Sequence, residues 1–555
     1  MSVPSPRTLR ELLEELSRVE GRGIVLAGDR APDERLPWNR FASLAAGTAA
    51  ALGEAVPPGS TVAAIGDVRL ELAVFWACAA SGRTAALLPA PSLLIAPAYY
   101  RRTVPKMLAA LAPAAVVADA RSLAKLRELL PAETMTAHRW LPGEELLVEA
   151  PLRALAGLPA PSASTRCYVQ FSSGTSGAPK GVPLTHANIL ANLDAMAERL
   201  ASGSEDVGVS WLPLHHDMGL LGGHLLPARC GMEHHLMRSM AFAARPWSWL
   251  ERLGRARATL SVAPGFAFDL CLGENCLAKL SPGLRLDSLR AVLDGSEPIR
   301  PGSPQDFARA LAPYGFPAGA VTPCYGLAEA SLAVTIADPG EAPLVERVDR
   351  GRFQREGVPS PAVEESKDAL EFVSVGRPLA GVRVAVPEDR EGEILVAGDS
   401  VMGGYLDSAS GDPFVRGPDG QTWLSTGDLG YMRGGLLYVT GRLKEILVCR
   451  GRNQDPLELE EAAEEVAGVR AGHTAAISFV DPAAGREVVV LLLEALETAG
   501  PELARAVRER VAETTGVVAD RIELVPRGTI ERTTSGKKRR AEARSRYLQT
   551  LEALQ

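Results

Sequence analysis

The chain has 555 residues, more than one hydrophobic core usually serves, so we expect several packed units. Hydrophobic residues make up 46% of it and charged residues 23%, which excludes a disordered chain. The net charge of −8 gives no reason to expect a nucleic-acid partner, because proteins that bind DNA or RNA usually carry a basic surface.

Helical and strand-like patterns alternate through the first 160 residues, and this alternation predicts an α/β fold. We expect helices at 9–19 and 70–80 and strands at 61–66 and 115–118. The most apolar stretch, residues 74–100, is interrupted by Arg83 and by four prolines or glycines. It therefore indicates a buried helix, a turn and a strand, and not a membrane span.

The seven cysteines form no CxxC pair, and pairing would leave one of them over, so a disulfide framework is disfavoured. Residues 1–20 mix Arg and Glu and lack the apolar core of a signal peptide. We therefore expect a cytoplasmic protein with reduced, mostly buried thiols.

Mixed strands and glycine turns continue to about residue 440, except between Glu341 and Glu371. Thirteen of these 31 residues are charged, too many to bury, so we expect this segment on the surface. Beyond Gly441 the pattern changes to a small α/β unit, which predicts one domain over 1–441 and a second over 442–555. The elements expected in the second domain are strands at 445–449, 474–480, 487–493 and 521–525, helices at 457–467 and 503–514, and a basic tail helix.

The loop 172–181 reads SSGTSGAPKG and follows a strand-like stretch at 168–171. Its small residues allow backbone N–H groups and hydroxyls to reach phosphate oxygens, and Lys180 adds a positive charge. The spacing differs from the Walker loop and from the dinucleotide GxGxxG, so kinases and dehydrogenases are disfavoured. A flexible Ser/Gly loop is the alternative.

The run CYGLAE at 324–329 places an aromatic ring, a glycine and a carboxylate close together. Tyr325 is suited to stacking on a purine and Glu329 to holding the Mg²⁺ of a nucleotide triphosphate. A core Tyr with a surface Glu explains the same residues if the run is taken alone.

Two further motifs lie toward the end of the chain. Asp428, in the run STGDLG at 425–430, is suited to gripping vicinal ribose hydroxyls, and Arg442 follows shortly after it. The tail run RTTSGKKRR at 532–540 places Lys537 where it could cap an α-phosphate. The alternatives are a loop Asp, a solvated Arg and a solvated basic tail.

Taken in chain order, the motifs at 172–181, 325–329, 426–430, 441–444 and 535–537 resemble the adenylate-forming superfamily. That superfamily includes acyl-CoA synthetases, peptide-synthetase adenylation domains and firefly luciferase, and the resemblance covers essentially the whole chain. It implies a large N-terminal α/β domain of several subdomains and a small, mobile C-terminal α+β domain.

Within the superfamily the chain is most similar to fatty acyl-AMP ligases. The similar runs are SWLPLHHDMGL at 210–220, APGFAFDLC at 263–271 and DGSEP at 294–298. In these ligases an extra segment, matched here by 341–371, is associated with poor use of coenzyme A and delivery to a carrier protein. Gly265, Ser296 and Asp455 depart from the usual Asn, Ala and Tyr, which leaves the pocket shape and the thiol-entry surface open.

The resemblance implies ATP and Mg²⁺ as cofactors and a role for each matching residue. It implies Lys537, Glu329 and His216 as catalytic residues, Glu329 and Thr175 as metal ligands, and Lys444 as the hinge. The implied nucleotide-binding residues are Ser172, Ser173, Gly174, Thr175, Ser176, Lys180, Gly295, Ser296, Glu297, Tyr325, Gly326, Leu327, Ala328, Asp428 and Arg442. The implied acyl pocket is lined by Trp211, Met218, Gly265, Phe266 and Phe268.

The expected partners are a medium- or long-chain fatty acid and a holo acyl carrier protein supplied in trans, because the chain ends soon after Lys537. The chain length of the acid and the identity of the carrier stay open. An acyl-CoA ligase is the nearest alternative, and a non-catalytic adenylate-binding scaffold is a second. The histidines 215, 216, 234 and 235 raise a metal cluster as a further alternative, but they lack Cys or carboxylate partners at ligand spacing.

Overall fold

The computed structural model describes residues 5–28, 31–92, 95, 97–172, 179–363, 366, 369–407, 410–443, 445, 447–449, 452–481, 486–496, 501–532 and 538–553. The predicted phosphate-loop residues Ser173, Gly174, Thr175 and Ser176 lie outside these ranges, as do the predicted hinge Lys444 and the predicted catalytic Lys537.

The N-terminal part of the chain builds a six-stranded sheet, parallel except for its last pair. Its strands run in the order β6 (Trp140–Pro142), β5 (Ala115–Ala118), β3 (Thr61–Ile65), β4 (Thr84–Leu87), β7 (Arg166–Ser172) and β8 (Lys180–Thr185). The strand expected at 115–118 is confirmed residue for residue, and that expected at 61–66 to within one residue.

A nine-stranded sheet lies beside it, with parallel inner strands. Its order is β17 (Arg377–Pro378), β14 (Ala333–Ile336), β13 (Val321–Gly326), β12 (Ala291–Asp294), β11 (Leu260–Ala263), β9 (Val207–Ser210), β10 (Glu233–Leu236), β1 (Gly23–Leu26) and β2 (Glu34–Pro37). Both large sheets are therefore buried on two faces, as parallel sheets usually are.

Alternation along the strands divides the apolar residues between layers, because successive side chains point to opposite faces. In β12, Leu293 belongs to the central core cluster and Val292 to an outer one. The helices that share the central cluster with both sheets are α1 (Leu9–Leu16), α2 (Trp38–Ala55), α3 (Val68–Ala80), α9 (His186–Arg199), η2 (Met218–Leu225) and α10 (Leu226–Arg229).

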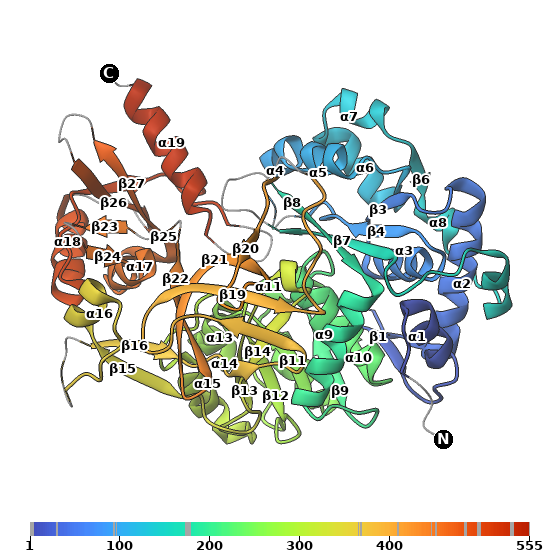
Figure 1. Ribbon diagram of the computed structural model, residues 1–555, viewed down its shortest axis with the longest axis horizontal. Helices are drawn as coiled ribbons and strands as arrows, with labels where there is room; N and C mark the ends of the chain where they lie inside the picture. Colours follow the sequence, from blue (N-terminus) through green and yellow to red (C-terminus); the bar gives the residue numbers. More distant parts are fainter. Residues whose placement is uncertain are drawn as a thin grey trace.

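Other helices cover the outer faces of the two large sheets (Figure 1). On the six-stranded sheet lie α4 (Pro97–Arg102), α5 (Val104–Leu111) and α6 (Ala120–Leu129). On the nine-stranded sheet lie α12 (Trp247–Ala256), α13 (Gly265–Leu272) and α15 (Ser303–Leu311). Shorter helices are α7 (Ala132–Ala137), α8 (Gly143–Leu146), η1 (Leu152–Gly157), α11 (Ser239–Ala244), α14 (Glu274–Leu277), η3 (Ala312–Tyr314) and η4 (Ala328–Ala330).

A third, antiparallel sheet follows and carries the predicted residues Asp428 and Arg442. Its strands are β18 (Val382–Ala385), β19 (Gly392–Gly398), β20 (Phe414–Arg416), β21 (Thr422–Arg433) and β22 (Leu436–Arg442).

The charged segment 341–371 is more ordered than its composition predicts. It forms β15 (Val345–Asp349), α16 (Arg350–Glu356) and the start of β16 (Ala369–Val373). Val348, Phe353 and Leu370 are buried against Tyr431 and Tyr438 of the third sheet. As expected, most of its described residues are at least partly exposed, while its few apolar residues gather on one side and pack.

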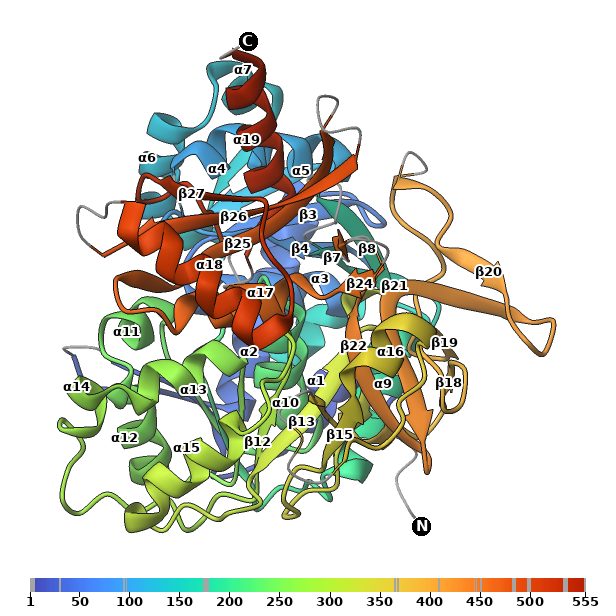
Figure 2. The same ribbon diagram turned by 90° about the vertical axis from the view of Figure 1, so that its left-hand side faces the viewer.

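The C-terminal elements form a separate group, coloured orange to red in Figures 1 and 2. They are β23 (Leu447–Cys449), β24 (Arg452–Gln454), α17 (Pro456–Glu464), β25 (Val469–Asp481), β26 (Arg486–Ala495), α18 (Pro501–Thr515), β27 (Arg521–Val525) and α19 (Arg540–Ala553). Two apolar clusters within this group are built only from residues after 446. Every element expected there is present, with β27 at its predicted bounds.

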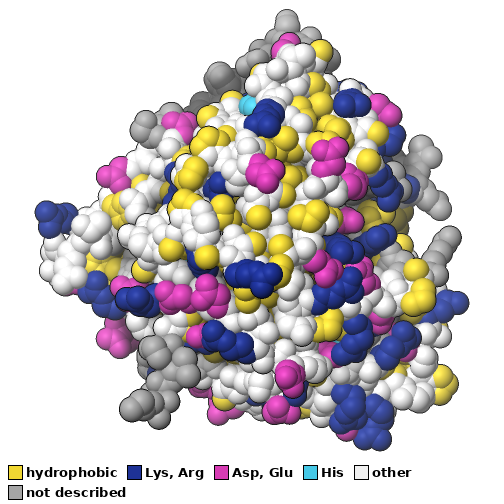
Figure 3. Space-filling model, turned by 90° about the vertical axis from the view of Figure 1, so that its right-hand side faces the viewer, with side chains coloured by type: hydrophobic (Ala, Val, Ile, Leu, Met, Phe, Trp, Pro, Cys, Tyr) yellow, Lys and Arg dark blue, Asp and Glu magenta, His cyan; other side chains and the backbone are white. Residues whose placement is uncertain are grey.

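The surface charges, the helices and the cysteines can be compared with what the composition predicts. Acidic and basic side chains are interspersed on the face shown in Figure 3, on which α2 and α8 lie. Among the described residues, no helix combines the length and apolar character that crossing a membrane requires. The described cysteine side chains are all free thiols.

Candidate active site

A cavity of about 480 Å³ lies where β7, β13 and β21 come together, one strand from each of the three sheets. Strand ends of α/β sheets are a common place for ligand sites. Of the predicted site residues it brings together Ser172, Lys180, His216, Met218, Ser296, Tyr325, Gly326, Leu327, Ala328, Glu329, Asp428 and Arg442.

Asp428 lies on one wall of the cavity and is held from two sides. It stands opposite Arg442 in the β21–β22 register, and the Arg442 Nε donates to its Oδ1 at 2.9 Å. The Tyr325 hydroxyl donates to its Oδ2 at 2.8 Å. Burial, followed by the negative Asp428, raises the pKa of Tyr325 well above 10, so this hydroxyl stays a donor. The arrangement presents a carboxylate of fixed orientation to the cavity.

A tight backbone return places Glu329 at the cavity. A Cβ on Gly326 would lie 1.8 Å from the Leu332 carbonyl oxygen, so only glycine fits. The chain then turns through η4 and reaches Ser331 at φ +71°, a left-handed conformation that is unusual for serine. Gly326 and Ser331 therefore fix the tight turn on which Glu329 lies.

Glu329 accepts two hydrogen bonds from neutral groups, both on Oε1. The Ser172 hydroxyl donates at 3.3 Å and the Tyr405 hydroxyl at 3.0 Å. The Lys180 Nζ lies 4.4 Å from the centre of the Tyr405 ring, within cation–π range. An anionic oxygen ligand that is oriented by neutral donors fits Mg²⁺, which prefers such ligands together with phosphate oxygens.

Tyr405 was missed by the sequence reasoning because it lies in no motif. Its pKa is raised by burial and then by Glu329 beside it, so its hydroxyl stays protonated and continues to orient the carboxylate. Only the approach of residues 405 and 329 in space could reveal this role.

His216 lines the cavity next to a tightly packed turn. The neighbouring His215 is half-buried and also lines the cavity, its ring centre 4.7 Å from that of His216, and desolvation lowers the pKa of His215 well below 6.5. Asp217 then caps η2, a π-helix, a form that frequently marks functional sites. A Cβ on Gly219 would lie 2.1 Å from the Pro213 carbonyl oxygen, so this turn also requires glycine.

The remaining wall of the cavity is apolar. Met218 of η2 faces it together with side chains from the central core cluster. These are Met196, Val262, Leu293, Leu332, Ala333 and Ile336.

The other predicted acyl-pocket residues do not line this cavity. Trp211 stacks on Phe242 with ring centres 3.8 Å apart, and Phe266 meets Trp211 edge-on. Phe268 is fully buried against Phe307. These side chains belong to the outer face of the nine-stranded sheet, whereas Val262 and Leu293 reach the cavity from its inner face. Strand alternation separates the two sets.

Gly265, Gly295 and Glu297 also lie outside the cavity lining. The Glu297 Oε1 accepts the Phe266 N–H at 2.6 Å and so holds the start of α13. A Cβ on Gly295 would lie 2.8 Å from the Cys324 sulfur. In this structure these residues pack and hydrogen-bond next to the cavity and do not line it.

The C-terminal group closes one side of the cavity through Arg539, two residues after Lys537, and Leu443 also lines it. Arg102 of α4 pairs with Glu531 of the C-terminal group at 3.5 Å. Among the described residues after Lys537, Arg539 thus reaches the cavity.

The histidines raised as a metal cluster occupy different places. His215 and His216 lie at the cavity, whereas His234 is buried beside His224, 2.9 Å between ring nitrogens. The part of the chain that the structure describes contains no group of three or more His, Cys, Asp or Glu that could hold a metal ion.

Comparisons with known proteins agree with this geometry. The family described as "AMP-binding enzyme" matches residues 18–406. A protein of Caulobacter vibrioides that bears the name acyl-CoA synthetase is 33% identical, with 85% of this chain and 83% of the relative covered. A long-chain-fatty-acid–AMP ligase of Mycolicibacterium smegmatis is 30% identical, with 92% and 89% covered.

Two further similarities concern the acyl substrate and the fold. A medium-chain-fatty-acid–[acyl-carrier-protein] ligase of Moorena producens is 29% identical, with 86% of this chain and 84% of the relative covered. A solved structure from a study of fatty acyl-adenylate ligases of E. coli and L. pneumophila superimposes with a TM-score of 0.86 at 31% identity, covering 98% of both chains. The family match over most of the chain and the relatives of 30% identity or more lead to one conclusion: this chain is a member of the AMP-binding enzyme family, whose adenylate-forming fold it shares.

Proposed function

We propose that this protein is a fatty acyl-AMP ligase that activates a medium- or long-chain fatty acid with ATP. A carboxylate oxygen of the acid attacks the α-phosphorus of ATP, the bond from that phosphorus to the pyrophosphate oxygen breaks, and acyl-adenylate and pyrophosphate form. A thiol then attacks the acyl carbon and AMP leaves.

The observation that carries this proposal is the composition of the cavity. One wall presents the carboxylates of Asp428 and Glu329 with the cations of Arg442 and Lys180, which suits a nucleotide. The other wall presents Met218 and its aliphatic neighbours, which suits a hydrocarbon chain. His216 lines the same cavity as the charged wall and the apolar wall. With the nucleotide on one wall and the hydrocarbon chain on the other, the fatty carboxylate would meet the α-phosphate where the two walls join.

In this proposal the protein works mainly by positioning and by offsetting charge. Asp428 accepts from the ribose hydroxyls, and the Tyr325 ring lies against the adenine. Lys180 approaches the β- and γ-phosphates, and Glu329 holds Mg²⁺, which neutralises phosphate charge when bound. Lys537 contacts the carboxylate and the α-phosphate during the first half-reaction.

Pyrophosphate release with a panel of fatty acids of increasing length tests the first half-reaction. We expect release that depends on both ATP and a fatty acid, with acyl-AMP accumulating when no thiol is present. Absence of release with every acid would contradict the proposal and favour an adenylate-binding scaffold.

We further propose a holo acyl carrier protein as the acceptor, with residues 442–555 moving as a unit between the half-reactions. The acyl-carrier-protein ligase of Moorena producens supports the acceptor. A contact supports control of the motion: Arg350 of α16 donates to Glu458 of α17 at 2.9 Å, and Gln354 donates to Gln454 at 2.9 Å. The segment 341–371 therefore contacts the unit that has to move.

Deleting 341–371 would uncover Tyr431 and Tyr438, so a sharper variant is Arg350→Ala with Gln354→Ala. It removes the contact with the C-terminal group and, within the segment, the hydrogen bond from Arg350 to the Ala369 carbonyl oxygen. Arg352→Ala on the same helix, exposed and paired within the helix to Glu356, is the matched control. We expect wild type and control to acylate the carrier protein far faster than coenzyme A, and the double variant to narrow that difference.

An acyl-CoA ligase is the second candidate, favoured by the name of the Caulobacter relative. Efficient thioester formation with coenzyme A by the wild-type enzyme would decide for it. If the wild type refuses coenzyme A and the double variant behaves identically, the ligase assignment stands and the role given to α16 fails.

A further inference from the structure

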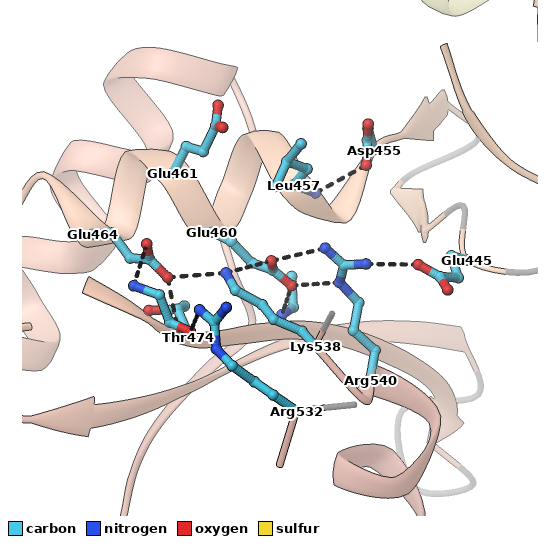
Figure 4. A network of polar contacts seen from close by, with 12 residues as sticks. Glu445, Asp455, Leu457, Glu460, Glu461, Glu464, Thr474, Arg532, Lys538 and Arg540 are labelled. Carbon is cyan, nitrogen blue, oxygen red and sulfur yellow. Dashed lines mark hydrogen bonds and ion pairs between the residues drawn. The ribbon is translucent and has the colours of Figure 1, made fainter. Parts of the chain in front are cut away.

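A carboxylate is buried at the centre of the C-terminal group, in α17. The side chain of Glu460 is 0% exposed and receives four hydrogen bonds (Figure 4). Its Oε1 accepts the Arg540 Nε at 2.6 Å and the Ala476 N–H of β25 at 2.9 Å. Its Oε2 accepts the Arg540 Nη2 at 2.9 Å and the Lys538 Nζ at 2.8 Å. A carboxylate offers about four lone-pair positions, so this group is saturated.

The two cations come from the chain immediately after Lys537. Lys538 also donates to Glu464, one turn further along α17, at 2.9 Å, and its side chain is only 12% exposed. Burial alone would raise the pKa of Glu460, but Arg540 and Lys538 beside it lower that pKa to about 2. The carboxylate is therefore charged at neutral pH and binds both cations to the helix.

The described residues 531–532 and 538–539 are joined to each other. Arg532 and Lys538 form an antiparallel bridge, and the Arg539 N–H donates to the Glu531 carbonyl oxygen at 2.9 Å. Arg532 also donates to the Gly472 carbonyl oxygen near the start of β25. Since Lys538 and Arg540 are fixed on Glu460, the joined residues are fixed on α17.

The same arginine reaches the chain that precedes β23. The Arg540 Nη1 donates to the Glu445 Oε2 at 2.6 Å, and Glu445 directly follows the predicted hinge residue Lys444. Arg540 thus spans two carboxylates, one on α17 and one beside the hinge position (Figure 4). The joined residues and the hinge-side chain are linked through a single guanidinium.

We propose that Glu460 is a positioning residue for the adenylation half-reaction: by binding Lys538 and Arg540 it sets the place from which Lys537 acts on the cavity. This inference rests on the proposed function, which assigns Lys537 to the first half-reaction. Lys538 is one peptide unit, about 3.8 Å between Cα atoms, from Lys537, so a shift of one moves the other. Misplacement of a catalytic group by about 1 Å commonly costs on the order of 100-fold in rate.

A purely structural role for Glu460 makes a different prediction. Removing one partner of a buried ion pair leaves an uncompensated charge, which can destabilise the whole C-terminal group. Loss of folding would reduce both half-reactions together. A positioning role instead affects acyl-AMP formation, which uses Lys537, and spares thiol transfer from acyl-AMP supplied ready-made, which does not.

The test compares Glu460→Gln with Glu465→Gln in the full chain. Glu465 lies at the end of the same helix, is 53% exposed and pairs with Arg510 on the surface, so its substitution is the matched control. For Glu460→Gln we expect a fall in kcat of acyl-AMP formation of on the order of 10- to 100-fold, with the KM for ATP within about threefold of wild type. We expect transfer from supplied acyl-AMP to a holo acyl carrier protein to stay within about threefold.

Arg540→Lys is a second variant, because it keeps a positive charge but loses the two-pronged bond and the reach to Glu445. We expect it to show the same division between half-reactions, and we expect the double variant to be little worse than either single one. Equal loss of both half-reactions in folded Glu460→Gln, or full adenylation by both variants, would overturn the proposal.

Hydrogen exchange separates this proposal from the proposed function. In Glu460→Gln we expect faster exchange in the peptide covering 527–541, with β25 and β26 unchanged, whatever the activity. No pyrophosphate release by the wild type would defeat the fatty acyl-AMP ligase assignment, while unchanged exchange in that peptide would defeat the role of Glu460. Should Glu460→Gln fail to fold, Arg540→Lys carries the same readouts.

Discussion

Asp428 in the third sheet and Glu460 in α17 are both buried carboxylates bound by an arginine, yet they are satisfied to different degrees. Among the described residues, Asp428 receives one bond from Arg442 and one from Tyr325, and it lines the cavity. Glu460 receives four bonds and does not line it. About two lone-pair positions on Asp428 are therefore left for the ligand of the proposed function, whereas Glu460 has none to offer.

The number of hydrogen bonds that a buried carboxylate receives thus distinguishes one that is available for a ligand from one that stabilises the fold. A binding carboxylate is oriented by some of its acceptor positions and keeps others for the ligand. A carboxylate that organises a loop uses all of them, because an unsatisfied buried group costs about 1–3 kcal/mol. Burial and an arginine partner are common to both and do not discriminate.

The largest effect should come from Lys537→Ala, because Glu460 is proposed to act only by positioning Lys537. We expect acyl-AMP formation to fall about 10²- to 10³-fold, because removing one group aimed at developing charge commonly costs that much. Pyrophosphate release measures it, with ATP binding and thermal unfolding as controls. Near-normal release would remove Lys537, and with it the argument for Glu460, from the first half-reaction.

Asp428→Ala should act mainly on the nucleotide. Hydrogen bonds to a charged group contribute about 1.5–3 kcal/mol, so we expect the KM for ATP to rise roughly 10- to 100-fold. Steady-state pyrophosphate release over a range of ATP concentrations measures this change. An unchanged KM would mean that Asp428 serves only its two protein partners and that the comparison fails.

Tyr325→Phe removes one of the two bonds that orient Asp428 and keeps the ring. We expect about a fivefold rise in the KM for ATP, since one such bond contributes about 1 kcal/mol. Tyr547→Phe is the control, because that hydroxyl bonds to Glu523 away from the cavity. Equal effects of the two substitutions would argue against any special role for the Tyr325 hydroxyl.

The smallest effect concerns stability and pH. The pKa of Glu460 is lowered from 4.5 to about 2 in the folded protein, so its charged form favours folding. That contribution is complete above about pH 4.5 and is lost as the pH falls toward 2. Burial raises the pKa values of the nearby Asp455 and Glu461 to about 7. Ionising these two carboxyls therefore opposes folding as the pH rises toward 7, which is a higher pH range than that of Glu460.

We therefore expect the difference in Tm between wild type and Glu460→Gln to be constant from pH 5 to 6 and to shrink at pH 3. Glu465→Gln, a surface change, should show a small difference throughout. A difference that grew on acidification would contradict the assigned direction of the pKa shift.

Local patterns predicted the elements well and the site unevenly. Strands such as Ala115–Ala118 and Arg521–Val525 follow from short apolar runs, whose period depends only on neighbouring residues. The motif residues Tyr325, Glu329 and Asp428 do gather at one cavity. Composition placed the charged segment 341–371 at the surface but did not show that three of its apolar residues pack together.

The apolar wall of the cavity could not be derived from the motif next to it. Met218 faces the cavity, but Phe268 packs on the outer side of the same sheet. Which face a helix covers depends on how the chain crosses the sheet, and this is a long-range choice. Tyr405 escaped for the same reason, since it belongs to no pattern that marks a site.

By itself the sequence determined the order of the motifs and the class of fold, because these depend on the local period of the residues. It also supplied glycine at positions 326 and 219, where the backbone stereochemistry leaves no room for a side chain. Only the tertiary structure decided which face of the nine-stranded sheet lines the cavity and which carboxylates are saturated. Both depend on contacts between residues far apart in the chain, as when Glu460 meets Arg540 and Tyr325 meets Asp428. Satisfaction of a buried charge is a property of the assembled structure, and no single stretch of residues specifies it.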